Sequence, residues 1–196
     1  MTVLSDKRIA FLATDGVEQV ELTEPWGAMR DAGAEVVLVS LDQDSVQGFD
    51  HLTPADTFPV DAKVTDADPA SFDALVLPGG VANPDRLRTE RDAVTFVRAL
   101  ADLGKPIAAI CHAPWLLIES GLARGRTLTS WPSLRTDLAN AGATWVDEEV
   151  VTDRGVLTSR KPDDLPAFNQ AAIRLFAGGG DDGQVSRGAI GAVDQT

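Results

Sequence analysis

Cysteine and histidine are scarce in this chain of 196 residues, which has one cysteine, Cys111, and two histidines. A single cysteine excludes an internal disulfide. With so few sulfur and imidazole ligands, we expect no metal site and no bound cofactor. No apolar run approaches the about 20 residues that cross a bilayer. The apolar run 9–13 is too short for the core of a signal peptide and lacks a cleavage site, so the sequence predicts a cytoplasmic protein.

Basic residues are also few. The chain has 17 lysines and arginines and 30 acidic residues, which gives a net charge of −13. A field of this sign repels phosphate groups, so we expect neither nucleic acid nor a membrane surface as a partner. The charge itself is typical of a soluble protein. Hydrophobic residues make up 44% of the chain, enough for a full core, and the length predicts one domain.

Short apolar runs alternate with longer amphipathic segments along the chain. The runs predicted to be buried strands are 8–14, 35–41, 74–77 and 107–110. The segments predicted to be helices are 23–32, 90–103, 113–120, 134–141 and 165–176. Strands that alternate with helices favour an α/β fold, in which crossover helices cover a mostly parallel sheet.

Two segments depart from this alternation. Residues 46–60 are predicted to be an irregular or short β excursion, and 150–159 a hairpin at a sheet edge, turning at 153–155. The chain shows no internal repeat and no linker, so residues 1–177 are expected to form one domain. Residues 178–196 are rich in Gly and Asp, and we expect a tail that packs poorly or reaches a neighbour.

The most informative segment surrounds Cys111, which follows the predicted strand 107–110 and precedes the predicted helix 113–120. A residue on such a turn lies at the carboxyl end of a parallel strand, where open α/β sheets place their ligands. The helix dipole there is expected to lower the pKa of the thiol and favour the reactive thiolate. The alternative is a buried structural cysteine. The position on the turn and the adjacent His112 favour a reactive cysteine over a structural one.

Two glycines follow the predicted strand 74–77 in the same way. Backbone N–H groups of Gly79 and Gly80, together with that of His112, are positioned to stabilise an oxyanion. The alternative is an ordinary turn, since most Gly-Gly pairs are turns.

A pair of acids follows the first predicted strand. Glu18 and Glu21 are three residues apart, so in a first helical turn they share a face at the same sheet edge. The alternative is that they only complement the helix dipole. A carboxylate aimed at a thiol can accept its proton and, if itself protonated, can donate to an oxidised sulfur.

Taken together, these segments resemble the ThiJ/PfpI superfamily, and within it the PfpI-like intracellular protease I branch, over about residues 7–177. The segments that carry the resemblance are Gly16-Val17-Glu18-Gln19-Val20-Glu21, Phe72-Asp73-Ala74-Leu75-Val76-Leu77-Pro78-Gly79-Gly80, Gly104-Lys105-Pro106, Ala109-Ile110-Cys111-His112-Ala113-Pro114, Asn140-Ala141-Gly142-Ala143 and Thr158-Ser159-Arg160. The resemblance implies a flavodoxin-like three-layer sandwich. It also implies that Cys111 is the nucleophile and that Glu21 contacts it.

The resemblance further implies a Cys-His-acid triad, with His112 as the histidine and the acid supplied by a neighbouring subunit. Asp85 matches that acid, where some relatives have glutamate, so we expect a homo-oligomer that is at least a dimer. Trp131 stands where relatives carry histidine or tyrosine. An indole cannot act as a base, so Trp131 is expected to be a pocket wall, with a core tryptophan as the alternative. His51 is expected to be a surface residue.

Two functions remain open at this point. The first is a stress-associated cysteine hydrolase that acts on a peptide or a small carbonyl compound, either intracellular protease-like or glyoxalase- and deglycase-like, with Gly79, Gly80, Glu18 and Trp131 around the substrate. The second is a redox sensor or stress-protective binding protein, in which Cys111 is reversibly oxidised. Both need the same thiolate.

Overall fold

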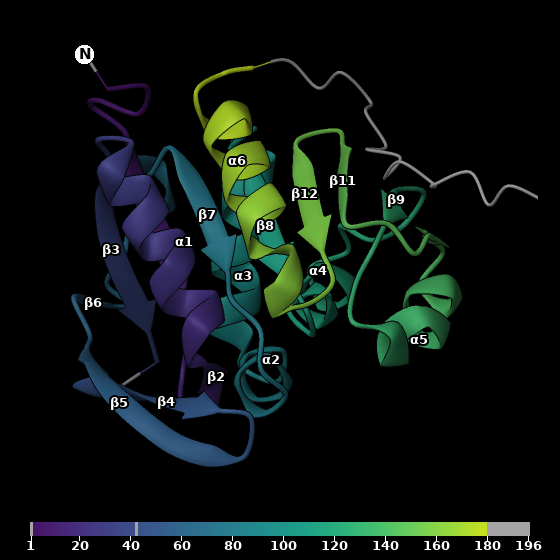
Figure 1. Ribbon diagram of the computed structural model, residues 1–196, viewed down its shortest axis with the longest axis horizontal. Helices are drawn as coiled ribbons and strands as arrows, with labels where there is room; N and C mark the ends of the chain where they lie inside the picture. Colours follow the sequence, from purple (N-terminus) through teal and green to yellow (C-terminus); the bar gives the residue numbers. More distant parts are fainter. Residues whose placement is uncertain (1, 42, 180–196) are drawn as a thin grey trace, which may run out of the picture.

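The computed structural model describes residues 2–41 and 43–179, and its centre is a seven-stranded sheet (Figure 1). In spatial order the strands are β11 (Val150–Asp153), β12 (Val156–Ser159), β8 (Ile107–Ile110), β7 (Ala74–Leu77), β1 (Arg8–Leu12), β3 (Glu35–Ser40) and β6 (Ala62–Lys63). All neighbouring strands are parallel except β11, which is antiparallel to β12 at the edge. This confirms the mostly parallel sheet and its edge hairpin.

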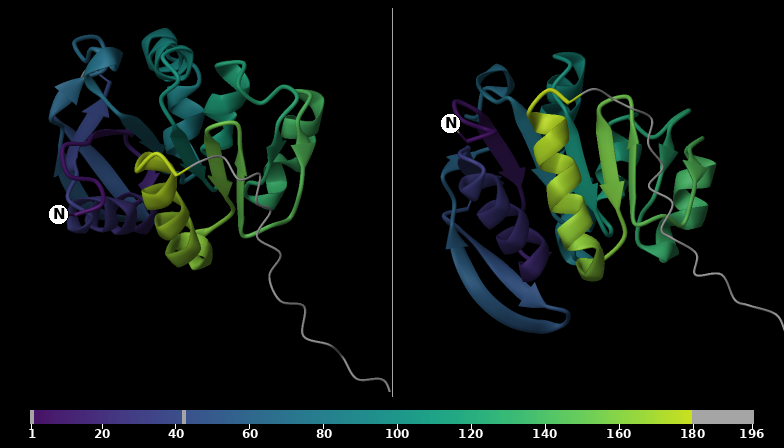
Figure 2. Two further views of the ribbon diagram at one scale, coloured as in Figure 1. Left: turned by 90° about the horizontal axis from the view of Figure 1, so that it is seen from above. Right: turned by 45° about the horizontal axis from the view of Figure 1, so that its top comes forward.

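Helices cover both faces of the sheet, as Figures 1 and 2 show. Helices α1 (Gln19–Asp31) and α6 (Leu165–Phe176) lie on one face, and α3 (Arg91–Asp102) and α4 (Pro114–Glu119) lie on the other. Alternate residues of each strand face opposite layers: Ile9 and Phe11 pack on the α1/α6 side, whereas Ala10 and Leu12 pack on the α3/α4 side. The three-layer sandwich is therefore confirmed. The remaining helical segments are α2 (Ala82–Leu87), α5 (Arg135–Asn140), η1 (Pro69–Ser71), η2 (Pro132–Leu134) and η3 (Pro162–Asp164).

The segment 46–60 is more regular than the sequence predicted. Strands β4 (Ser45–Asp50) and β5 (Thr53–Pro59) form an antiparallel hairpin, and β2 (Val17–Glu18) adds to it in parallel. A second small sheet joins β9 (Thr127–Leu128) to β10 (Thr144–Trp145). No helix in the described ranges is long and apolar enough to cross a membrane. Most of the predicted tail, 180–196, lies outside the described residues, so its separation from the domain stays a prediction.

The carboxyl ends of β1, β7 and β8 meet at one edge of the sheet, because these three strands are adjacent and parallel. The segments that follow them begin at Ala13, Pro78 and Cys111. All three groups of residues singled out in the sequence therefore converge on this edge.

Candidate active site

Cys111 occupies a strained turn between β8 and α4. Its φ is +63°, a left-handed conformation that non-glycine residues rarely adopt. Backbone hydrogen bonds hold it there: its N–H donates to Ser159 O at 3.1 Å, and its carbonyl accepts from Trp131 N–H at 2.9 Å. The residue is 6% exposed. The fold thus keeps an unfavourable backbone geometry at the residue that the sequence predicts to be the nucleophile.

His112 turns back toward its sequence neighbour. Its Nδ1 lies 3.1 Å from Cys111 Sγ, and its Nε2 lies 3.4 Å from Ser133 Oγ. The ring is packed between Trp115 and Trp131, at centroid distances of 5.3 and 5.7 Å. Burial lowers the pKa of His112, so the imidazole is neutral at pH 7 and can accept a proton.

Glu21 lies in the first turn of α1 and is fully buried behind the cysteine. Its Oε2 accepts the N–H of Gly79 at 3.0 Å, whereas Oε1 has no nitrogen or oxygen partner among the described residues. Burial raises the pKa of Glu21 to about 8, against the smaller opposing effect of a hydrogen bond with Cys111. At pH 7 this carboxyl group is therefore mostly protonated. The proton belongs on Oε1, since Oε2 is already an acceptor.

The expected lowering of the Cys111 pKa is wrong, because the thiol is buried. Burial raises the pKa of Cys111 and the charge of Glu21 raises it further, while the N–H groups of Gly80 and His112 lower it by less. The six residues of α4 also make a short dipole. Because burial opposes two adjacent charges, the pair holds at most one negative charge near neutrality, and Cys111 rests as a thiol beside the protonated Glu21.

The loop after β7 is pinned by a residue that sequence reasoning missed. Asn83 is fully buried, and its Nδ2 donates to the carbonyls of Pro78 and Gly79 at 2.9 and 3.0 Å. Its Oδ1 accepts Thr14 N–H at 2.8 Å, which ties this loop to the end of β1. Because Gly79 donates its N–H to Glu21, it is not free to bind an oxyanion, in contrast to the expectation. The N–H groups of Gly80 and His112 face the sulfur, and the N–H of Gly80 is shared between Cys111 and Glu21.

Replacing Gly79 by alanine should disrupt the site, because no space exists for a side chain there. A Cβ would overlap Glu21 Oε2 and lie 2.6 Å from Cys111 Cβ. We expect a loss of about 1–3 kcal/mol in the free energy of unfolding and a change in the alkylation rate of Cys111. Gly27→Ala, where a Cβ meets nothing within 4 Å, is the matched control and should not destabilise the protein in chemical denaturation. Equal stability of the two variants would contradict this packing.

Glu18 and Glu21 do not share a helical face as predicted, because Glu18 belongs to β2 and precedes the helix. The Glu18 carboxylate instead accepts the backbone N–H of His51 at 3.2 Å. His51 is exposed, as expected of a surface residue, yet it also lines the same cavity as Cys111. The sequence carried no sign of this, since the hairpin that brings His51 over the site was not predicted as a regular element.

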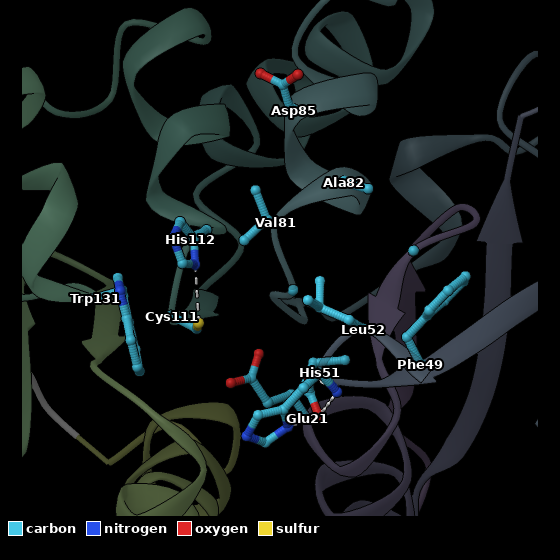
Figure 3. A pocket seen from close by; sticks show the side chains of 13 residues that line it. Glu21, Phe49, His51, Leu52, Val81, Ala82, Asp85, Cys111, His112 and Trp131 are labelled. Carbon is cyan, nitrogen blue, oxygen red and sulfur yellow. Dashed lines mark hydrogen bonds and ion pairs between the residues drawn. The ribbon is translucent and has the colours of Figure 1, made fainter. Parts of the chain in front are cut away.

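A cavity of about 630 Å³ opens above Cys111 (Figure 3). Its wall includes four large apolar side chains, those of Phe49, Leu52, Val81 and Trp131. Trp131 is 37% exposed, so it lines the pocket and is not a core residue. The size and the apolar wall are typical of a small-molecule site.

Asp85 lies in the first turn of α2 and also borders the cavity. Within the chain its Oδ1 accepts hydrogen bonds from Arg88, at 2.7 Å from Nη2 and 3.0 Å from Nε. Figure 3 shows its carboxylate at the far side of the cavity from Cys111. Its predicted contribution to the His112 of another subunit stays a prediction.

Known proteins share the sequence pattern and the fold of this chain. The profile of the DJ-1/PfpI family matches residues 7–175. The chain is 44% identical over 171 residues to "Protein/nucleic acid deglycase 2" of Escherichia coli (strain K12), covering 87% of this chain and 98% of that protein. It is 41% identical over 175 residues to "General stress protein 18" of Bacillus subtilis (strain 168), with 87% and 98% covered. The crystal structure of DJ-1beta from Drosophila melanogaster superposes with a TM-score of 0.79 at 28% identity, covering 91% of this chain and 92% of that one.

Proposed function

This chain belongs to the DJ-1/PfpI family, and we propose that it is a stress-associated hydrolase in which Cys111 attacks an electrophilic carbonyl. One observation carries the proposal. The sulfur of Cys111 lines the cavity on a strained turn, with His112 Nδ1 at 3.1 Å and the buried carboxyl group of Glu21 behind it. A nucleophile with a proton acceptor in hydrogen-bond reach is the arrangement that covalent catalysis needs.

The reaction would begin when Cys111 Sγ bonds to the carbonyl carbon and the carbonyl π electrons move to oxygen. The thiol proton passes to His112 Nδ1, which is neutral because of burial. The N–H groups of Gly80 and His112 face this region and would stabilise the developing negative charge. With a peptide, the tetrahedral intermediate collapses to a thioester and the amine leaves with the proton from His112. With a 2-oxoaldehyde such as methylglyoxal, which has no leaving group, the oxygen takes back the proton, and the hemithioacetal becomes a thioester when a proton moves from the former aldehyde carbon to the neighbouring carbonyl carbon. Water then releases the acyl group and restores the thiol.

The cavity favours a small carbonyl compound or the glycated side chain of a peptide as the substrate. Its volume of about 630 Å³ and its apolar wall exclude a folded protein domain but admit one modified side chain. The relative named a deglycase supports this chemistry. We also propose a homodimer or larger oligomer, in which Asp85 of one subunit reaches the cavity of another.

Turnover of three substrates would test this function: methylglyoxal, a methylglyoxal-treated peptide and an unmodified peptide. We expect turnover of at least one carbonyl substrate by freshly purified protein. A second function, redox sensing, is favoured by the protonated Glu21, which can donate a hydrogen bond to an oxidised sulfur. Stoichiometric oxidation of Cys111 by dilute peroxide, with no turnover of any of the three, would support the sensor and contradict the hydrolase.

A further inference from the structure

The mouth of the cavity carries a second group of chemically active side chains, those of Glu18, Asp50 and His51. One ligand atom from each lies within 4.8 Å of the others. His51 Nδ1 is 3.1 Å from Asp50 Oδ1 and 3.7 Å from Glu18 Oε1. The proposed hydrolase mechanism uses none of these contacts.

The distances suit a tetrahedral metal ion. Zinc binds imidazole nitrogen and carboxylate oxygen at about 2.0–2.2 Å, and tetrahedral angles then place neighbouring ligand atoms about 3.3–3.5 Å apart. The separations of 3.1 and 3.7 Å lie on either side of this value. The third separation, between the carboxylate oxygens of Asp50 and Glu18, is within 4.8 Å, and rotation of the exposed Asp50 side chain would bring the three atoms onto one ion.

The backbone holds the three residues in this arrangement. Strand β2 pairs with β4 so that Glu18 stands opposite Phe49, and Asp50 pairs with Thr53 across the hairpin. The N–H of His51 donates to the Glu18 carboxylate at 3.2 Å, which ties the hairpin tip to β2. The Glu18 side chain is only 12% exposed. Sheet register and this hydrogen bond thus fix the backbone of the three residues, while the side chains of Asp50 and His51 are 81% and 82% exposed.

The negative charge at the mouth of the cavity has no matching cation in the cavity wall. It comes from the Glu18 carboxylate, because the buried Glu21 of the same cavity is mostly protonated at pH 7. No lysine or arginine is found among the side chains that line this cavity in the described part of the chain. A bound dication would reduce this excess of negative charge.

We propose that Glu18, Asp50 and His51 form a Zn²⁺ site at the mouth of the cavity. Three protein ligands leave a position for water or for a group of the substrate. The sequence predicted no metal because it has few cysteines and histidines. That argument left out the carboxylate oxygens that β2 and the hairpin bring beside a single histidine.

Titration calorimetry of the full chain with Zn²⁺ tests this site. The rival location is the pair Cys111 and His112, which also offers zinc ligands, so the Cys111→Ala variant is measured alongside. We expect wild type and Cys111→Ala to bind one Zn²⁺ per chain with similar affinity. His51→Ala and Glu18→Gln should each bind at least about tenfold more weakly, since loss of even an outer-shell partner costs about 10–100-fold. Asp44→Asn, an exposed acid just before β4, is the matched control and should bind like wild type.

Two results would overturn the proposal. Zinc bound by His51→Ala but lost in Cys111→Ala would place the ion on the catalytic pair. An absence of binding in wild type would remove the site altogether. Circular dichroism of each variant separates lost ligands from lost folding, and these measurements do not depend on the hydrolase activity.

Discussion

Replacing Cys111 by serine should reduce turnover of the carbonyl substrate by a factor of about 10³ or more, to the level of buffer alone. The hydroxyl keeps the shape of the thiol, but its proton is far harder to remove. The neutral His112 at 3.1 Å can share a thiol proton and is too weak a base for an alcohol in a buried site. Initial rates with saturating substrate measure this loss.

The variant is expected to fold, because the backbone bonds at this position, from Cys111 N–H to Ser159 O and from Trp131 N–H to Cys111 O, do not involve the side chain. Far-ultraviolet circular dichroism and a melting curve provide the control. A folded Cys111→Ser protein that keeps more than a tenth of the wild-type rate would show that another group performs the chemistry.

Replacing Glu21 by glutamine should remove a pH dependence of stability that this one carboxyl group creates. The pKa of Glu21 is raised by burial from 4.5 to about 8, so the folded state holds the proton more tightly than the unfolded chain. Its contribution to stability is therefore complete below pH 4.5 and is lost as the pH rises toward 8. Over that window the free energy of unfolding should fall by about 4 kcal/mol from this group.

Glutamine is neutral at every pH, so relative to wild type the Glu21→Gln protein should become more stable as the pH increases from 5 to 8. The carboxamide oxygen of the variant can still accept the N–H of Gly79, whose nitrogen lies 3.0 Å from Glu21 Oε2 in the wild type. Urea denaturation at pH 5, 6, 7 and 8 measures the trend. Glu24→Gln on the exposed side of the same helix is the matched control. If the free energy of unfolding changes with pH in the same way in wild type and in Glu21→Gln, a buried, protonated Glu21 is refuted.

The sequence predicted the parts of the fold that local apolar pattern determines. Strands β7 and β8 have the predicted bounds, since each is a run of four buried residues between polar or glycine-rich segments. Helix α2 was not predicted, because Pro84 and the preceding Gly79-Gly80 read as a loop. The hairpin 45–59 was only partly predicted, since β5 is almost wholly exposed and lacks an apolar face.

The candidate site, like the fold, was predicted only in part. Cys111, His112 and Glu21 were expected at one sheet edge, and the structure brings them together there. The ionisation of Cys111 and Glu21 could not be predicted, because it depends on how completely α1 and the loop after β7 cover them. Asn83 and His51 were missed for a related reason. Each acts through a partner distant in sequence, Thr14 for the first and Glu18 for the second.

Mass spectrometry of a reaction quenched in acid tests the central claim most directly. Wild-type protein is mixed with excess carbonyl substrate, quenched at successive times within the first turnover, and digested to locate any added mass. The proposed mechanism predicts an adduct on the peptide that contains Cys111, formed at least as fast as product. Turnover with Cys111 unmodified at every time, or with the adduct only on another residue, would contradict the assignment of Cys111 as the nucleophile.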